Sequence, residues 1–155
     1  MSKIKLLIVD DHHLVRNGLE LLFKNESEFE VISIVENGEE ALLAIKKNKP
    51  NVVITDVSMP GMNGIELTKT IISKYPAVNV LVLSMHNEEA YVLDALDSGA
   101  MGYITKDSDE LEIKEAIISI AKGKMYYSSS LSDILAKKLI NKSKTIVAKD
   151  KLTTR

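Results

Sequence analysis

Three carboxylates follow two apolar segments of the sequence, at positions where side chains of an α/β protein can do chemistry. Asp10 and Asp11 come directly after the run 4–9, and Asp56 comes directly after the run 52–55. Open α/β sheets bind ligands at the carboxyl ends of their strands. If the two runs are neighbouring strands, the three carboxylates meet at one edge of the sheet. Any one of them, taken singly, is explained by a helix cap or a loop turn.

Such a cluster needs a counter-ion, because like charges at close range repel one another. Mg²⁺ suits it, since this cation takes oxygen ligands and keeps waters and phosphate oxygens. Two more polar residues follow strand-like runs: Ser84 and Lys106. Singly, they fit a strand-end hydroxyl and a surface lysine. Together with a metal-binding cluster they form the set that phosphoryl transfer requires, because that reaction depends on positioning and charge stabilisation.

Other chemistries have little support. The chain has no Gly-x-x-x-x-Gly-Lys-Ser/Thr or Gly-x-Gly-x-x-Gly loop, and it has no Cys, which excludes disulfides and thiolate sites. Ser58 stands two residues after Asp56, where an aspartate-based phosphatase would use a second acid; a metal-dependent phosphatase is therefore the weakest hypothesis. His12, His13 and His86 lack a metal-ligand spacing, and we interpret them as surface or helix-start residues.

The elements that must position these residues alternate along the chain. Amphipathic segments between the apolar runs predict five helices, one of them capped by Asn37 with Glu40 three residues on. Another is expected to begin at Asn87 and end at Gly99, and the last to begin near Asp107. Continuously apolar runs are typical of parallel strands covered on both faces. The sequence therefore predicts a doubly wound α/β domain, with strands over 4–9, 31–35, 52–55, 78–83 and 101–104.

The end of the chain differs in charge. From residue 124 onward there are eight Lys or Arg and two Asp, whereas residues 1–123 hold the other twelve basic and twenty acidic residues. We expect a domain over 1–123, then a linker over 124–150. The linker begins with a connector around Tyr126 and Tyr127 and contains a helix over 131–140 that packs on the body or on a second copy. No apolar stretch reaches the ~18 residues of a membrane span and no signal peptide is visible, so we expect a cytoplasmic location.

As a set, these motifs resemble the receiver domain of two-component response regulators, over residues 4 to 122. The motifs are Leu-Leu-Ile-Val-Asp10-Asp11-His-His, Asp56-Val-Ser-Met-Pro60-Gly61-Met-Asn-Gly64, Ser84, and Tyr103-Ile-Thr-Lys106. The resemblance implies a flavodoxin-like (βα)5 fold with five parallel strands in the order 2-1-3-4-5. It also implies a phosphoacceptor switch rather than an enzyme.

The resemblance implies that a sensor histidine kinase phosphorylates Asp56 with Mg²⁺ as cofactor. Asp56 and Asp11 would ligate the cation, with Asp10 acting mainly through water and Ser58 through its backbone carbonyl.

It also implies a switch. Lys106 would pair with the incoming phosphoryl group, Ser84 would swing to hydrogen-bond it, and Tyr103 would change rotamer in step. The face of the fourth helix would respond.

Three further segments resemble the NarL/FixJ sub-family: His12-His13-Leu-Val-Arg, Ser-Met-His after the fourth strand, and Tyr-Tyr-Ser-Ser-Ser-Leu. Residues 152–155 resemble the opening of a LuxR-type helix-turn-helix domain. This implies a longer transcription factor that pairs as a homodimer on phosphorylation and binds DNA only through a domain absent from this sequence. Met85 departs from the pattern, because many receivers have a small residue there. That departure keeps one alternative open: a receiver-like interaction module that works without phosphorylation.

Overall fold

The computed structural model describes residues 3–85, 89–137 and 140. Its strands and helices alternate as β1 (Ile4–Val9), α1 (His13–Lys24), β2 (Phe29–Val35), α2 (Gly38–Lys47), β3 (Val52–Thr55), α3 (Gly64–Lys74), β4 (Asn79–Ser84), α4 (Glu89–Ser98), β5 (Gly102–Thr105), α5 (Glu110–Ala121) and β6 (Tyr126–Tyr127). The strands form one parallel sheet in the order β2-β1-β3-β4-β5-β6. The predicted order 2-1-3-4-5 is confirmed, and a sixth strand extends the sheet.

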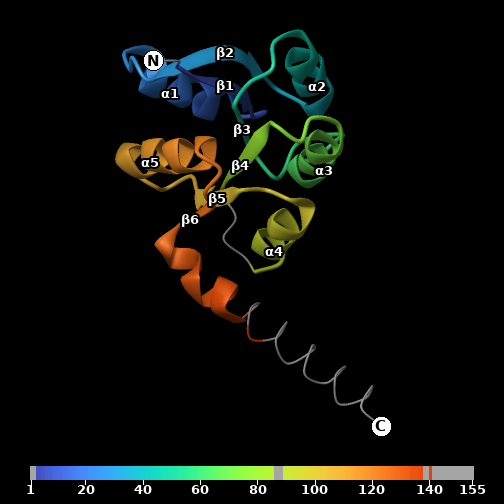
Figure 1. Ribbon diagram of the computed structural model, residues 1–155, viewed down its shortest axis with the longest axis vertical. Coiled ribbons are helices and arrows are strands. Elements are labelled where there is room, and N and C mark those ends of the chain that lie inside the picture. Colours follow the sequence, from blue (N-terminus) through green and yellow to red (C-terminus); the bar gives the residue numbers. More distant parts are fainter. Residues whose placement is uncertain (1–2, 86–88, 138–139, 141–155) are drawn as a thin grey trace.

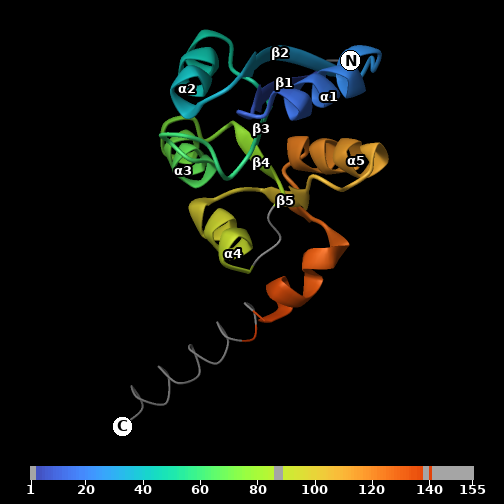
Figure 2. The same cartoon turned by 180° about the vertical axis from the view of Figure 1, so that it is seen from behind.

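Helices cover both faces of the sheet, with α1 and α5 on one face and α2, α3 and α4 on the other (Figures 1 and 2). Successive side chains of a strand point to opposite faces. In β1, Leu6 and Ile8 therefore pack beneath α1 and α5, whereas Leu7 and Val9 pack beneath α2 and α3. The continuously apolar runs exist because both faces of these strands are buried. Within the described residues, no helix is long and apolar enough to cross a membrane.

Local side-chain caps fix where the helices begin. The Asn37 side chain accepts the backbone N–H of Glu40 at 2.9 Å, as the sequence predicts. The predicted start of α5 near Asp107 is wrong by two residues, because Asp109 is the cap and accepts the backbone N–H of Glu112 at 2.8 Å. Residues 105–108 instead form a turn, closed by the Ser108 N–H on the Thr105 carbonyl at 3.0 Å. Gly99 ends α4 with φ +102°, and the expected start of that helix at Asn87 lies outside the described residues.

The segment after α5 is attached to the sheet. Tyr126 and Tyr127, expected to be a connector, form β6, which pairs in parallel with Gly102 and Tyr103 of β5. The correction has a physical cause: β5 would otherwise leave unpaired backbone groups at the sheet edge, and tyrosine favours strands.

A 3₁₀ turn over Ser129–Leu131 follows β6, and residues 132–137 and 140 are helical. Leu131 is 1% exposed and packs with Tyr103, Val82 and Val92. The tail thus packs on the body through Leu131. The expected linker remainder over 141–150 and the segment 151–155 lie outside the described residues.

Candidate functional site

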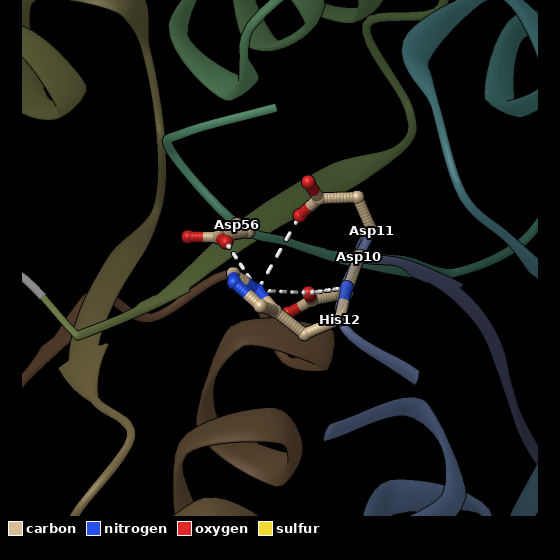
Figure 3. A group of neighbouring side chains, drawn as sticks. All are labelled: Asp10, Asp11, His12 and Asp56. Carbon is tan, nitrogen blue, oxygen red and sulfur yellow. Dashed lines mark hydrogen bonds and ion pairs between the residues drawn. The ribbon is translucent and has the colours of Figure 1, made fainter. Parts of the chain in front are cut away.

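Two buried carboxylates stand at the ends of adjacent strands. Asp10 follows β1 and Asp56 follows β3, and each side chain is 3% exposed. Their backbones extend the sheet by one residue, because the Asp56 N–H donates to the Val9 carbonyl and the Asp10 N–H to the Val35 carbonyl, each at 3.1 Å. Asp11 completes the group and is partly exposed. The structure therefore brings the three predicted carboxylates together at one edge of the sheet (Figure 3).

Lys106 reaches this cluster from the end of β5. Its Nζ lies 2.9 Å from Asp10 Oδ2 and 3.2 Å from Asp56 Oδ2, and its side chain is 5% exposed. The Lys106 backbone N–H donates to the Ser84 carbonyl at 2.8 Å, which holds the start of the lysine segment beside the end of β4. The ammonium partly neutralises carboxylates that the strands force into proximity.

His12 also belongs to the cluster, which sequence reasoning missed. It is the helix-start residue of α1, as predicted, but within the described residues its side chain makes no capping hydrogen bond. Instead, its Nδ1 lies 3.0 Å from Asp10 Oδ1, 3.3 Å from Asp11 Oδ1 and 3.5 Å from Asp56 Oδ2 (Figure 3). The available signal was its position directly after two acids at a strand end. His13 lies outside the cluster and contacts Arg16 and Asn17 on α1, and His86 is outside the described residues.

The three carboxylates of the cluster fit a hard divalent cation. Asp10, Asp11, His12 and Asp56 each offer a ligand atom within 4.8 Å of the others. Among the described residues, the buried Asp11 Oδ1 has no hydrogen-bond partner. A buried oxygen without a hydrogen-bond partner is costly unless a bound group such as an ion compensates it. Carboxylate oxygens are the ligands that Mg²⁺ takes in proteins.

The other predicted residues lie around the cluster at different depths. Ser84 is fully buried at the end of β4, and Ser58 is exposed in the loop after β3, lining a hollow together with Asp11 and His12. Tyr103 is fully buried with its ring in the apolar cluster beneath α4, together with Leu131. The structure thus places Tyr103 in the packing between the sheet and α4.

The loop that follows Asp56 folds closely over its own backbone. Asp56 Oδ1 accepts the Val57 N–H at 2.7 Å, and the Gly64 N–H donates to the Val57 carbonyl at 2.8 Å. A Cβ on Gly64 would lie 1.9 Å from the Asp56 carbonyl oxygen. Only glycine fits this approach, which explains how Gly64 shapes the loop.

Comparisons with known proteins agree on one family. The family model described as "Response regulator receiver domain" matches residues 6–118. The transcriptional regulatory protein DegU of Brevibacillus brevis is 40% identical over 136 residues, which cover 88% of this chain and 58% of that protein. The chain thus spans less than two thirds of that relative's length.

Two solved structures share the fold. A LuxR-family two-component response regulator from Aurantimonas sp. SI85-9A1 superposes with a TM-score of 0.83 at 32% identity, over 90% of this chain and 99% of that one. The isolated receiver domain of RcsB from Salmonella enterica serovar Typhimurium, in the presence of the phosphomimetic BeF3⁻, gives a TM-score of 0.78 at 28% identity, over 86% and 99%.

Proposed function

Because this chain belongs to the response regulator receiver family, we propose that Asp56 is the residue on which it accepts a phosphoryl group. Receiver domains are signalling switches of two-component systems and not classical enzymes, and phosphorylation on Asp is typical of them. One observation carries the choice of Asp56: this carboxylate lies at a strand end where two other carboxylates and the Lys106 ammonium meet. Such a site can hold a phosphoryl group in place by charge.

The proposed step is a transfer between two nucleophiles. A carboxylate oxygen of Asp56 attacks the phosphorus of a phosphohistidine on the kinase. The bond between phosphorus and the imidazole nitrogen breaks, its electron pair stays on that nitrogen, and the imidazole takes a proton from solvent. Self-dephosphorylation reverses the modification: water attacks the phosphorus, the bond to Asp56 breaks, inorganic phosphate leaves, and the excess proton passes to solvent. A small donor such as acetyl phosphate enters the same step with acetate as its leaving group.

Lys106 and Ser84 are the residues that we assign to the transferred group. The Lys106 ammonium already contacts Asp56 Oδ2 and is positioned to pair with a phosphoryl oxygen added there. Ser84 is buried at the end of the strand between those of Asp56 and Lys106, and its hydroxyl is assigned to hydrogen-bond the same group. Tyr103 is assigned to change rotamer in step, which would alter the packing beneath α4.

Asp10, Asp11 and Asp56, with the backbone carbonyl of Ser58, are the residues that we assign to Mg²⁺. The buried Asp11 Oδ1, with no hydrogen-bond partner among the described residues, supports the assignment. When bound, the cation supplies positive charge toward phosphoryl oxygens.

We extend the proposal to the partners of this receiver domain and to an output domain like that of its relatives. A sensor histidine kinase supplies the phosphoryl group, phosphorylated copies pair as a homodimer, and a LuxR-type helix-turn-helix binds DNA to control transcription. This is supported by the name of the DegU relative, a transcriptional regulatory protein of which this chain covers 58%.

Intact-mass measurement after incubation with Mg²⁺ and acetyl phosphate tests the assignment of Asp56. The wild-type chain is expected to gain the mass of one phosphoryl group, and Asp56→Asn is expected to gain none. Asp133→Asn is the matched control, because Asp133 is an exposed residue that does not belong to the cluster; it should be modified as fully as wild type. An equal adduct on Asp56→Asn would reject Asp56 as acceptor. No adduct on any variant would favour the alternative, a module that binds partners without phosphorylation.

A further inference from the structure

The His12 ring lies beside the oxygen ligands assigned to the cation and offers a nitrogen donor in addition to them. We propose that His12 is a further ligand of the divalent-cation site, donating through Nδ1. This ligand would make the site more selective. With the imidazole, the site prefers transition-metal ions such as Mn²⁺, Co²⁺ or Zn²⁺ over Mg²⁺ more strongly than a site made of the carboxylates alone. The inference rests on the proposed cation site, whose residues it shares.

The distances around Nδ1 are those of ligands that share one ion. Nδ1 lies 3.0, 3.3 and 3.5 Å from one oxygen each of Asp10, Asp11 and Asp56 (Figure 3). Adjacent ligands at about 2.1 Å from one metal ion are roughly 3 Å apart. The three distances from Nδ1 are therefore close to those between adjacent ligands of one ion, and the four donor atoms, which come from two separate strand ends, lie within 4.8 Å of one another.

The backbone preorganises the ring for this role. The His12 N–H donates to Asp10 Oδ1 at 2.8 Å, and the ring Nδ1 lies 3.0 Å from the same oxygen. A side chain that merely capped α1 would turn toward the helix N–H groups, and within the described residues His12 makes no such bond. Because His12 is 57% exposed, the other ring nitrogen can keep its proton toward water, which leaves Nδ1 for the ion.

Lys106 engages only one of the three carboxylate oxygens that lie near His12 Nδ1. Its Nζ contacts Oδ2 of Asp10 and Oδ2 of Asp56. Asp10 Oδ1 instead contacts His12, and the buried Asp11 Oδ1 has only the 3.3 Å ion-pair contact with His12. Two of the three oxygens near the imidazole, Asp10 Oδ1 and Asp11 Oδ1, are thus not engaged by the lysine, whereas Asp56 Oδ2 contacts both side chains.

Ligand chemistry gives the direction of the selectivity. Mg²⁺ is a hard ion that takes oxygen ligands and keeps its waters, so an added imidazole contributes little to its binding. Imidazole nitrogen suits Zn²⁺ and other first-row transition ions, whose affinity for such sites rises from Mn²⁺ toward Cu²⁺. Removing the ring should therefore weaken transition-metal binding much more than Mg²⁺ binding.

Calorimetric titration of Mg²⁺ and Co²⁺ into the metal-free chain at one fixed pH tests this. His12→Ala is expected to weaken Co²⁺ binding at least about tenfold, while Mg²⁺ affinity stays within about threefold of wild type. His13→Ala is the matched control, since it removes the neighbouring imidazole outside the cluster; neither affinity should change. His12→Gln provides a second variant that keeps a polar side chain, and it should lose Co²⁺ affinity as His12→Ala does.

A direct readout accompanies the titration. In chain labelled with ¹⁵N at histidine, Zn²⁺ should shift the Nδ1 resonance of His12 and leave that of His13 unchanged. Equal weakening of Mg²⁺ and Co²⁺ in His12→Ala would overturn the inference, as would an unshifted resonance. Tighter Mg²⁺ binding in His12→Ala would also overturn it, because the ring would then be a competitor of the cation. The mass measurement on Asp56 is independent, so either result can fail without the other.

Discussion

Lys106 bridges Asp10 and Asp56: its Nζ lies 2.9 Å from one carboxylate and 3.2 Å from the other, in a position almost closed to solvent. The lysine comes from the end of β5, and the two acids come from the ends of β1 and β3, so the contact spans the centre of the sheet. Burying two carboxylates near one another and beside the partly exposed Asp11 is unfavourable, and the Lys106 ammonium is buried with them.

We therefore expect Lys106→Met to lower the free energy of unfolding by about 3 kcal/mol at pH 7 without divalent cations, because buried carboxylates lose their partner. Added Mg²⁺ should restore more stability to this variant than to wild type, since an ion that binds only the folded state stabilises it. Urea unfolding with and without Mg²⁺ measures both effects. Lys114→Met is the control, because Lys114 pairs with Glu26 at the surface and should cost less than about 1 kcal/mol. Equal losses in the two variants would contradict the assignment of a stabilising role to the buried contact.

Gly64→Ala should disturb the loop that carries Asp56. The added Cβ would meet backbone atoms of Asp56 and Val57, which cannot move aside cheaply. We expect a loss of about 3 kcal/mol and a lower yield of the phosphoryl adduct. Urea unfolding and intact mass give the two readouts. Gly18→Ala is the matched substitution: its Cβ meets nothing within 4 Å on α1, so it should stabilise the chain by about 0.5–1 kcal/mol. The close approach would be refuted if both variants gained stability.

Leu131→Ala should weaken the attachment of the tail. Leu131 is buried in the same apolar cluster as Tyr103 and Val92, and the cavity left behind should cost about 3 kcal/mol. Amide exchange in α4 should also become faster, because this cluster supports the helix. Leu111→Ala, at an exposed position of α5, should change stability by less than about 0.5 kcal/mol. Indistinguishable unfolding and exchange in the two variants would show that the contact adds nothing.

Because the Tyr127 hydroxyl is buried, we expect the free energy of unfolding to fall at alkaline pH. Burial raises the pKa of Tyr127, and its hydroxyl donates to the Ala100 carbonyl at 3.2 Å. The folded state holds this proton more tightly than the unfolded state does, so the contribution is fully present below the ordinary value of 10.0 and is lost as the pH rises beyond it. Tyr127→Phe should lower the free energy of unfolding by about 1 kcal/mol at neutral pH. Above pH 10.0, the free energy of unfolding of this variant should decline less steeply than that of wild type. Urea unfolding from pH 8 to roughly pH 11 gives the free energy of unfolding of both proteins as a function of pH. Parallel curves would contradict a contribution of Tyr127 to the alkaline decline.

The features of the fold and site that could be predicted are those encoded by residues close together in the sequence. The strand runs could be predicted because burial on both faces requires uninterrupted apolar residues, as in 4–9 and 52–55. The meeting of Asp10 with Asp56 followed, since adjacent parallel strands end at one edge. Asn37 and Glu40 form their cap within four residues of each other, so the start of α2 was also predictable.

Features that depend on tertiary contacts or on the rotation of a side chain could not be predicted. Tyr126 and Tyr127 become a strand only because β5 offers an unpaired edge, which their own composition does not reveal. His12 joins the cluster because its ring turns toward Asp10, Asp11 and Asp56, and no spacing rule encodes that rotation. The switch roles of Ser84 and Tyr103 and the Mg²⁺-binding role of the Ser58 carbonyl stay predictions, because they concern a phosphorylated or metal-bound state.

The two-residue strand β6 has a consequence for self-association. Between Gly102 and Tyr103 on one side and Tyr126 and Tyr127 on the other, backbone groups are paired that would otherwise form an open template. An uncovered strand edge recruits strands from other chains. Proteolytic cleavage between α5 and β6 would therefore allow the edge of β5 to become exposed in an otherwise intact fold. By covering this edge, β6 limits aggregation through it.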